Sequence, residues 1–165
     1  MKISLAEHRG FCYGVKRAVK MAEDCREMEK ARTLGPIIHN PQVVKKLEKD
    51  GIIMADSLSE INEGTVIIRS HGVGPTIYNE AKAKNLNIVD ATCPHVKKAQ
   101  LDAKRIIDQD EKLVIIGEKF HPEVISISQW GANRAIIIET EKEAEKVSFS
   151  ANLGVVAQTT FSQEL

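Results

Sequence analysis

Short runs rich in β-branched residues alternate with amphipathic segments along the chain. The runs predict strands over Lys2–Ala6, a stretch ending at Ile38, Thr65–Arg69, Leu86–Val89, Leu113–Ile116, Ala135–Ile138 and Leu153–Val156. Apolar residues at three- and four-residue spacing, with charged runs between, predict helices over Val15–Lys30, Pro41–Lys49, Pro75–Lys84, Pro94–Asp108, a short segment from Glu123, and most of Glu139–Lys146. This alternation is typical of an α/β protein whose parallel sheets are covered by helices.

The pattern divides the chain into two similar halves. We expect a linker near Asn87–Thr92, a first α/β unit over 1–92 and a second over 93–165. Each half has a cysteine after its first predicted strand, which suggests a repeat of one α/β unit. The last strand is followed only by Gln158–Leu165, whereas a parallel strand leads into a crossover helix. The second unit is therefore expected to be incomplete and the chain truncated.

Composition narrows the class of protein. The 165 residues are 42% hydrophobic, enough for a packed core, but no apolar run has the length of a membrane span. With 23 basic and 23 acidic residues and 4% aromatics, neither a basic surface nor stacking platforms for nucleic acid are expected. The N-terminus has no secretory pattern, so a cytoplasmic protein is predicted. Three cysteines in a reducing compartment indicate metal binding or catalysis rather than disulfides.

Reactive side chains follow most of the predicted strands. In chain order they are Cys12, His39, His71, Cys93, the pair His121 and Glu123, and finally Gln158 with Thr159. Ligands of open α/β sheets bind beyond the carboxyl ends of the strands, so these groups are expected to line one site. Cys25 instead lies on the apolar stripe of its helix and is predicted to be a buried structural thiol.

Several of these positions suit an anion or a metal. Prolines at first helical positions predict helix N-termini just after the strand exits, and such ends present free N–H groups and a positive dipole. His39 and His71 beside them could bind phosphate. The same field favours thiolates at Cys12 and Cys93, and the flanking Gly10 and Gly14 allow a close approach to the sulfur's ligand.

The spacing leaves the cofactor open. Cys12 and Cys93 are too far apart for a structural zinc motif, but they could hold one cofactor between the two units. Glu123, two residues after His121, is a candidate proton donor. One alternative is a diphosphate- or metal-binding α/β module without redox chemistry. Another is a zinc hydrolase that uses both cysteines and His121 as ligands and Glu123 as base.

Five segments together resemble one known family. They are Gly10-Phe11-Cys12-Tyr13-Gly14-Val15, Arg69-Ser70-His71-Gly72-Val73, Asp90-Ala91-Thr92-Cys93-Pro94, His121-Pro122-Glu123-Val124 and Gln158-Thr159-Thr160. In this order and spacing they are similar to the 4-hydroxy-3-methylbut-2-enyl diphosphate reductases of the methylerythritol phosphate route to isoprenoids. The resemblance spans the whole sequence, and five motifs in register are far more specific than any one alone.

The resemblance implies three similar α/β units in a trefoil around a central [4Fe–4S] cluster, each unit supplying one cysteine. Cys12 and Cys93 would be two cluster ligands, while His39, His71 and His121 would line the diphosphate and substrate cavity. Glu123 would donate a proton, and Thr159 would help to order the substrate hydroxyl. Ferredoxin or flavodoxin would deliver two electrons, and the products would be isopentenyl and dimethylallyl diphosphate.

One departure from the family concerns the third unit. The third cysteine and the Ser and Asn groups that hold the diphosphate from that unit have no counterpart in these residues. Cys25 is a poor substitute because it lies well along the helix that follows Cys12. We therefore expect this chain alone to hold a cluster poorly, to reduce substrate weakly or not at all, and to expose an apolar face where the missing unit docks.

Overall fold

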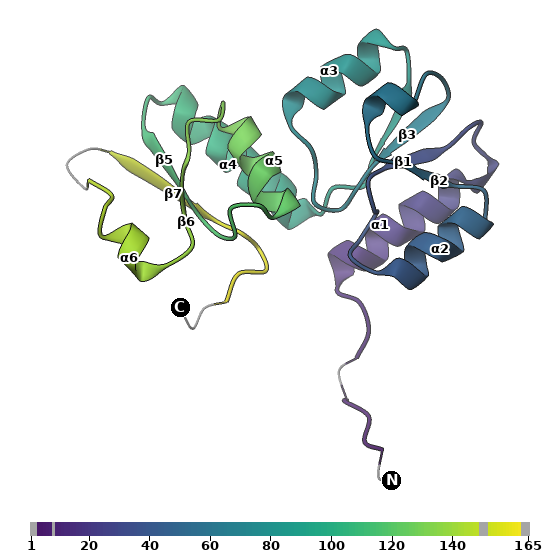
Figure 1. The fold of residues 1–165 in the computed structure, drawn as a ribbon, viewed down its shortest axis with the longest axis horizontal. Coiled ribbons are helices and arrows are strands. Elements are labelled where there is room, and N and C mark those ends of the chain that lie inside the picture. The colour runs from purple at the N-terminus through teal and green to yellow at the C-terminus, as the bar shows by residue number, and fades with distance from the viewer. Residues whose placement is uncertain (1–2, 8, 149–151, 163–165) are drawn as a thin grey trace.

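Two parallel β-sheets form the framework of the protein, as the computed structural model shows for residues 3–7, 9–148 and 152–162 (Figure 1). The first sheet has the order β2-β1-β3-β4 and consists of β1 (Arg32–Leu34), β2 (Ile53–Ala55), β3 (Thr65–Ile68) and β4 (Asn87–Asp90). The second has the order β6-β5-β7 and consists of β5 (Lys112–Ile116), β6 (Ile136–Ile138) and β7 (Leu153–Ala157). Every strand pair is parallel, which confirms the predicted α/β class.

Helices connect the strands. The α-helices are α1 (Tyr13–Asp24), α2 (Pro41–Lys49), α3 (Pro75–Ala83), α4 (Pro94–Asp108), α5 (Pro122–Trp130) and α6 (Glu141–Ala144), and the 3₁₀ turns are η1 (Cys25–Glu27) and η2 (Leu58–Glu60). Helices α2, α3 and α4 begin with the prolines that the sequence predicts, whereas α5 begins at Pro122, one residue before the expected Glu123. None of the helices in the described ranges has the length and apolar composition needed to cross a membrane.

The first sheet is covered on both faces. Ile67 of β3 points into a core with α1 and α2, where Ala18, Ala22 and Leu47 are buried. Its neighbours Val66 and Ile68 point to the opposite face and pack against α3 and η2. This alternation follows from the two-residue period of a strand, and it explains why β3 is apolar at four successive positions.

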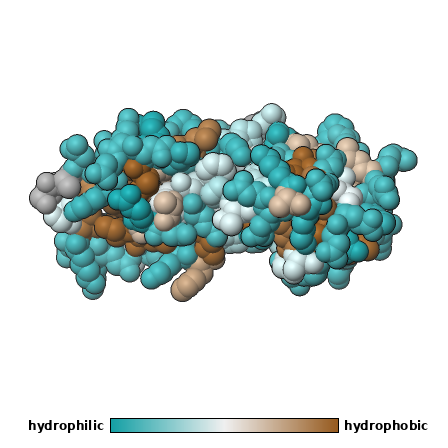
Figure 2. Space-filling model, turned by 90° about the horizontal axis from the view of Figure 1, so that it is seen from above, coloured by the Kyte–Doolittle hydropathy of each residue, from teal (hydrophilic) through white to brown (hydrophobic). Residues whose placement is uncertain are grey.

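The second sheet packs mainly against α4 and α5. Ala103 and Ile106 of α4 and Ile127 of α5 are buried against Leu113 and Ile115 of β5. The other face carries a smaller cluster formed by Val114, Ile138 and Val147 with the partly buried Ala144 and Leu153. In the view of Figure 2 the surface is largely hydrophilic, with apolar side chains exposed in patches over both halves.

Helices α4 and α5 also join the second sheet to the first. Ser126 Oγ of α5 donates a hydrogen bond to the backbone oxygen of His71 at 2.9 Å, and Trp130 Nε1 donates one to the backbone oxygen of Val73 at 2.9 Å. Lys97 of α4 lies over the rings of Tyr78 and Trp130. We call this contact between residues 69–78 and helices α4 and α5 the seam.

Several expectations about the elements need correction. Residues 3–6 form no strand, since Ile3 and Leu5 are 73% and 74% exposed and no described strand pairs with them; Lys2 lies outside the described residues. Helix α1 ends at Asp24 rather than Lys30, because the chain tightens into η1. The expected linker over Asn87–Thr92 is wrong for its first four residues, which form β4. The stretch expected to end at Ile38 is wrong at its end, because β1 ends at Leu34. In addition, strand β2 was not expected.

Candidate active site at the helix N-termini

Three histidines from distant parts of the chain meet at one point. His39 precedes α2, His71 follows β3, and His121 is the N-cap of α5. Their ring centroids are separated by 4.4 Å (His39–His71), 5.4 Å (His71–His121) and 5.6 Å (His39–His121). One ring nitrogen from each lies within 4.8 Å of the others. The strand-exit rule therefore placed these three residues correctly, and we call them the histidine triad.

Local capping fixes the direction of each ring. Asn40, the N-cap of α2, accepts hydrogen bonds from the backbone N–H groups of Gln42 and Val43, which sets the turn that carries His39. His121 Nδ1 accepts a hydrogen bond from the Glu123 backbone N–H at 3.2 Å. The seam then brings His121 beside His71, because Ser126 of the same helix is bonded to the His71 backbone.

Desolvation favours the neutral forms of His71 and His39. Burial, followed by repulsion from His39, His121 and Arg69, lowers the pKa of His71 to about 3. Burial and then His121 and Arg69 also lower the pKa of His39 below its usual value. Both rings are therefore neutral near pH 7, with one N–H donor each. The buried Nδ1 of His71 has no hydrogen-bond partner among the described residues, so this atom is available to a ligand.

The tautomer of His121 decides between an anion and a metal. Because Nδ1 accepts the Glu123 N–H bond, a neutral His121 carries its proton on Nε2. An Nε2–H group is a donor, which suits a phosphate oxygen. A metal at Nε2 would require the other tautomer, whose Nδ1–H would face the Glu123 N–H. The geometry therefore favours an anion at the triad over a metal ion.

Glu123 is a buried carboxyl group held by Thr159. Glu123 is only 1% exposed. Its Oε1 accepts a hydrogen bond from the Thr159 backbone N–H at 2.6 Å, and its Oε2 accepts one from Thr159 Oγ1 at 3.0 Å. Thr159 is exposed and lies in the turn after β7. The hydroxyl therefore links a buried carboxyl group to the surface, which is an arrangement that can pass a proton.

Gln158 holds this turn in place. Its backbone N–H donates to the Ile116 oxygen at 2.8 Å, and its side-chain Oε1 accepts from the Glu118 N–H at 2.9 Å. The loops after β5 and β7 are thereby fixed to one another. This buried amide is what presents Thr159 to Glu123.

Two cysteines occupy equivalent positions at helix starts. Cys12 is the N-cap of α1 and Cys93 the N-cap of α4, and neither side chain caps its own helix. A Cβ placed on Gly14 would lie 2.5 Å from Cys93 Sγ, so only glycine admits the sulfur here. Cys93 thus lies against the residue two positions after Cys12. Cys12 is exposed and Cys93 half-buried, so both thiols are accessible.

Cys25 differs from these two thiols. It is 1% exposed, donates to the Met21 backbone oxygen and belongs to the core beside α1 and α2. Burial, with a smaller effect of Asp24, raises the pKa of its thiol, which makes it a poor nucleophile and ligand. The interpretation of Cys25 as a structural residue is confirmed.

Two polar residues of the site were not found from the sequence. Arg69 has a buried Nε without a hydrogen-bond partner, and its Nη1 lies against Gly35, whose φ of +71° and missing Cβ make room for it. Gln100 is fully buried in α4 and donates to Ser126 Oγ at 3.2 Å. Two features of the sequence could have indicated them. Arg69 is a charged residue directly after an apolar strand, and Gln100 is an amide on the apolar stripe of a helix.

The fold, the site and the similarity to known proteins together identify the family of this chain. These features define a parallel α/β protein with a candidate ligand site at its helix N-termini, built from a histidine triad, a buried carboxyl group and two accessible thiols. Residues 3–165 match the LytB protein family, and the chain belongs to that family.

Its relatives carry one name. The chain is 47% identical to 4-hydroxy-3-methylbut-2-enyl diphosphate reductase of Pelobacter propionicus over 99% of its own length and 59% of the relative's. It is 45% identical to the Geobacter metallireducens enzyme of that name, covering 58% of it. The solved E-1-hydroxy-2-methyl-but-2-enyl-4-diphosphate reductase of Plasmodium falciparum superposes with a TM-score of 0.90 at 34% identity, over 96% of this chain and 51% of that one. The chain thus spans about 59% of the first curated relative it matches.

The lowered pKa of His71 predicts a pH effect on stability. The unfolded chain binds a proton near pH 6.5, whereas folded His71 binds one only near pH 3. Acidification below about pH 6.5 therefore favours the unfolded chain, and the stabilising effect of neutral His71 is lost as the pH falls toward 3. His71→Gln should give a shallower fall in the free energy of unfolding between pH 7 and 5. Urea denaturation at each pH measures it, with exposed His95→Gln as control; equal slopes in all three proteins would contradict the assignment.

Proposed function

We propose that this chain forms the diphosphate-binding and proton-donating part of a 4-hydroxy-3-methylbut-2-enyl diphosphate reductase. The reaction adds two electrons and two protons, breaks the C–O bond to the allylic hydroxyl and releases water. The products are isopentenyl and dimethylallyl diphosphate. The observation that carries the proposal is the convergence of three histidines with a buried carboxyl group, and the names of the relatives support it.

The histidine triad would bind the diphosphate. Each ring would supply one N–H donor, and the positive dipole ends of α2 and α5 lie beside His39 and His121. The guanidinium of Arg69 adds a fixed positive charge, which acts on both His39 and His71. A bound dianion would raise the pKa of these rings, so binding strengthens as the pH falls.

Glu123 would supply a proton to the leaving hydroxyl. Hydroxide is a poor leaving group, so the reaction needs an acid at that oxygen. The carboxyl group is buried, adjoins His121 through the backbone and receives two hydrogen bonds from Thr159. Thr159 would orient the hydroxyl of the substrate and renew the proton on Glu123 from the surface.

The thiols fit a [4Fe–4S] cluster as two of its ligands. Both are free and accessible, both stand at the N-cap of a helix, and Gly14 leaves space beside Cys93 Sγ. The cluster would supply electrons and an open iron for the oxygen atom of the substrate. Ferredoxin or flavodoxin would be the electron donor, and a cytoplasmic location would keep the thiols reduced.

A module that binds diphosphate or a metal without redox chemistry is the second candidate. The observation in its favour is the spacing of the three imidazoles, whose nitrogens lie close enough to share one ion. The His121 tautomer opposes a metal there. Binding of zinc with no gain of iron or labile sulfide would favour this second candidate.

Pyrophosphate binding tests the triad directly. Titration of the chain with inorganic pyrophosphate in a calorimeter at pH 6 and pH 8 should give tighter binding at pH 6. His39→Gln and His71→Gln should each weaken it about tenfold, because a charge-assisted hydrogen bond contributes about 1.5–3 kcal/mol. The exposed His95→Gln is the matched control. Equal affinity for pyrophosphate in all variants would show that the triad does not bind the diphosphate.

Iron content tests the thiols. After anaerobic reconstitution with iron and sulfide, Cys12→Ser and Cys93→Ser should each lower iron and visible absorbance per chain severalfold. Cys25→Ala should leave both unchanged, since its thiol is buried away from the helix starts. The measurement uses this chain and a chimaera that joins it to the remaining part of the Pelobacter propionicus relative. A loss confined to Cys25→Ala would refute the ligand assignment.

Glu123→Gln tests the proton donor in the same chimaera. The amide is isosteric and can keep both bonds to Thr159, so fold, iron content and pyrophosphate affinity should stay unchanged. Turnover should fall at least about 100-fold, in line with the usual contribution of general acid catalysis. The exposed Glu118→Gln is the control. Full turnover in Glu123→Gln would rule out this role.

A further inference from the structure

Arg69 is a charged group without a counterion. Its side chain leaves the end of β3, its Nε is fully buried, and that nitrogen has no hydrogen-bond partner among the described residues. No ion pair in the described part of the chain includes it. Removing a guanidinium from water without pairing it is unfavourable, so this position favours a bound anion.

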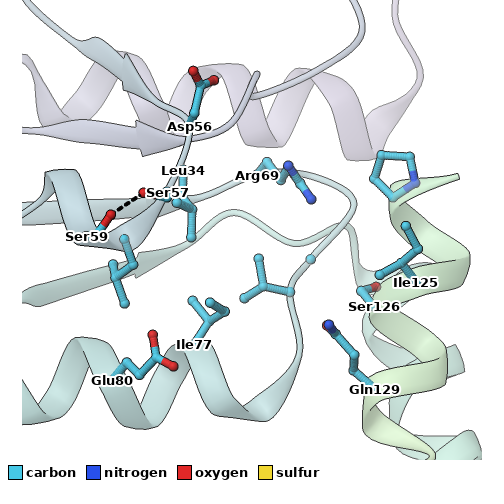
Figure 3. Close-up of a pocket in the computed structure, with 14 residues that line it drawn as sticks. Leu34, Asp56, Ser57, Ser59, Arg69, Ile77, Glu80, Ile125, Ser126 and Gln129 are labelled. Atoms are coloured by element: carbon cyan, nitrogen blue, oxygen red, sulfur yellow. Dashed lines mark hydrogen bonds between the residues drawn. The ribbon is translucent and has the colours of Figure 1, made fainter. Parts of the chain in front are cut away.

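A cavity of about 410 Å³ opens beside this guanidinium (Figure 3). The figure shows Arg69 on one side and the α5 residues Ile125, Ser126 and Gln129 on another. Leu34 and Ile77 supply apolar walls from the first sheet and α3. The volume is in the range of small-molecule sites, and the cavity lies along the seam, where such sites are common.

The mouth of the cavity carries the opposite charge. Asp56 and Glu80, both exposed, belong to its lining together with Ser57 and Ser59. Two carboxylates repel a dianion or trianion more strongly than a monoanion, so a diphosphate is disfavoured here. The three histidines of the triad are not among the lining residues, so this cavity shares only Arg69 with the site proposed above.

We propose that this cavity is a second binding site, for a small carboxylic acid with a short branched apolar body. The carboxylate would pair with the guanidinium of Arg69 in the two-bond geometry that arginine favours. The apolar body would lie against Leu34, Ile77 and Ile125, and the Gln129 amide would contact the ligand from α5. The site differs from the triad in both ligand charge and apolar content.

A carboxylate bound in this cavity would change the protonation of the histidine triad. Arg69 repels protons from His39 and His71, and a bound carboxylate would screen that charge. The triad would then take up protons at higher pH and lose part of the attraction of Arg69 for a second anion. This consequence rests on the proposed function, whereas carboxylate binding itself does not.

Calorimetric titration of the chain with 3-methylbutanoate tests the site. Arg69→Gln should weaken binding at least tenfold, and Arg26→Gln, an exposed arginine paired with Asp50, should not. Acetate, which lacks the apolar body, and 3-methylbutan-1-ol, which lacks the charge, should each bind at least tenfold more weakly. Unchanged affinity in Arg69→Gln, or acetate binding as tightly as 3-methylbutanoate, would overturn the proposal.

A second variant separates loss of the site from loss of the fold. Ser59→Trp fills the mouth while leaving Arg69 and the core intact, so it should abolish 3-methylbutanoate binding and keep the thermal transition and pyrophosphate affinity. His71→Gln should instead weaken pyrophosphate binding about tenfold and leave 3-methylbutanoate affinity unchanged. Pyrophosphate binding without 3-methylbutanoate binding would refute the cavity site alone, and 3-methylbutanoate binding without pyrophosphate binding would refute the triad alone.

Discussion

Two hydrogen bonds across the seam determine whether this protein has a site at all. Helix α5 carries His121 and Glu123 at its start, and its Ser126 and Trp130 donate to the backbone oxygens of His71 and Val73. A helix advances about 1.5 Å per residue, so anchoring its later turns fixes its first turn closely. Without these bonds the groups of the second sheet would not reach the histidines of the first. The acceptors are backbone atoms, so the contact constrains the path of the chain after β3.

The positive charge at the site comes from Arg69 and not from His71 and His39. Burial keeps His71 and His39 neutral, while Arg69 and the helix N-termini supply attraction for an anion. Arg69 Nε is buried without a hydrogen-bond partner among the described residues, so this N–H group favours an acceptor at the site. The neighbouring Glu123 is buried and accepts two hydrogen bonds from Thr159.

Rules based on short sequence segments predicted the elements whose ends are set by their own residues. Prolines at first helical positions gave the bounds of α2 and α4 to the residue, since proline both permits and begins a helix there. The three-residue β2 has no such signal, and residues 3–6 have strand composition without a described partner. The rule that ligands bind beyond the carboxyl ends of strands predicted that the three histidines of the triad line one site. Arg69 escaped it because an unpaired charge is visible only when the groups around it are known.

The position of Trp130 gives this protein a built-in optical reporter. It is the only tryptophan in the sequence, and its indole N–H is bonded across the seam to the Val73 oxygen, beside Tyr78 and Lys97. Indole emission responds to hydrogen bonding and to nearby cations, so its wavelength follows the docking of the second sheet on the first. Separation of the two sheets would therefore change the emission of Trp130 even while both sheets stay folded. Fluorescence of a single sample can thus distinguish separation of the sheets from unfolding.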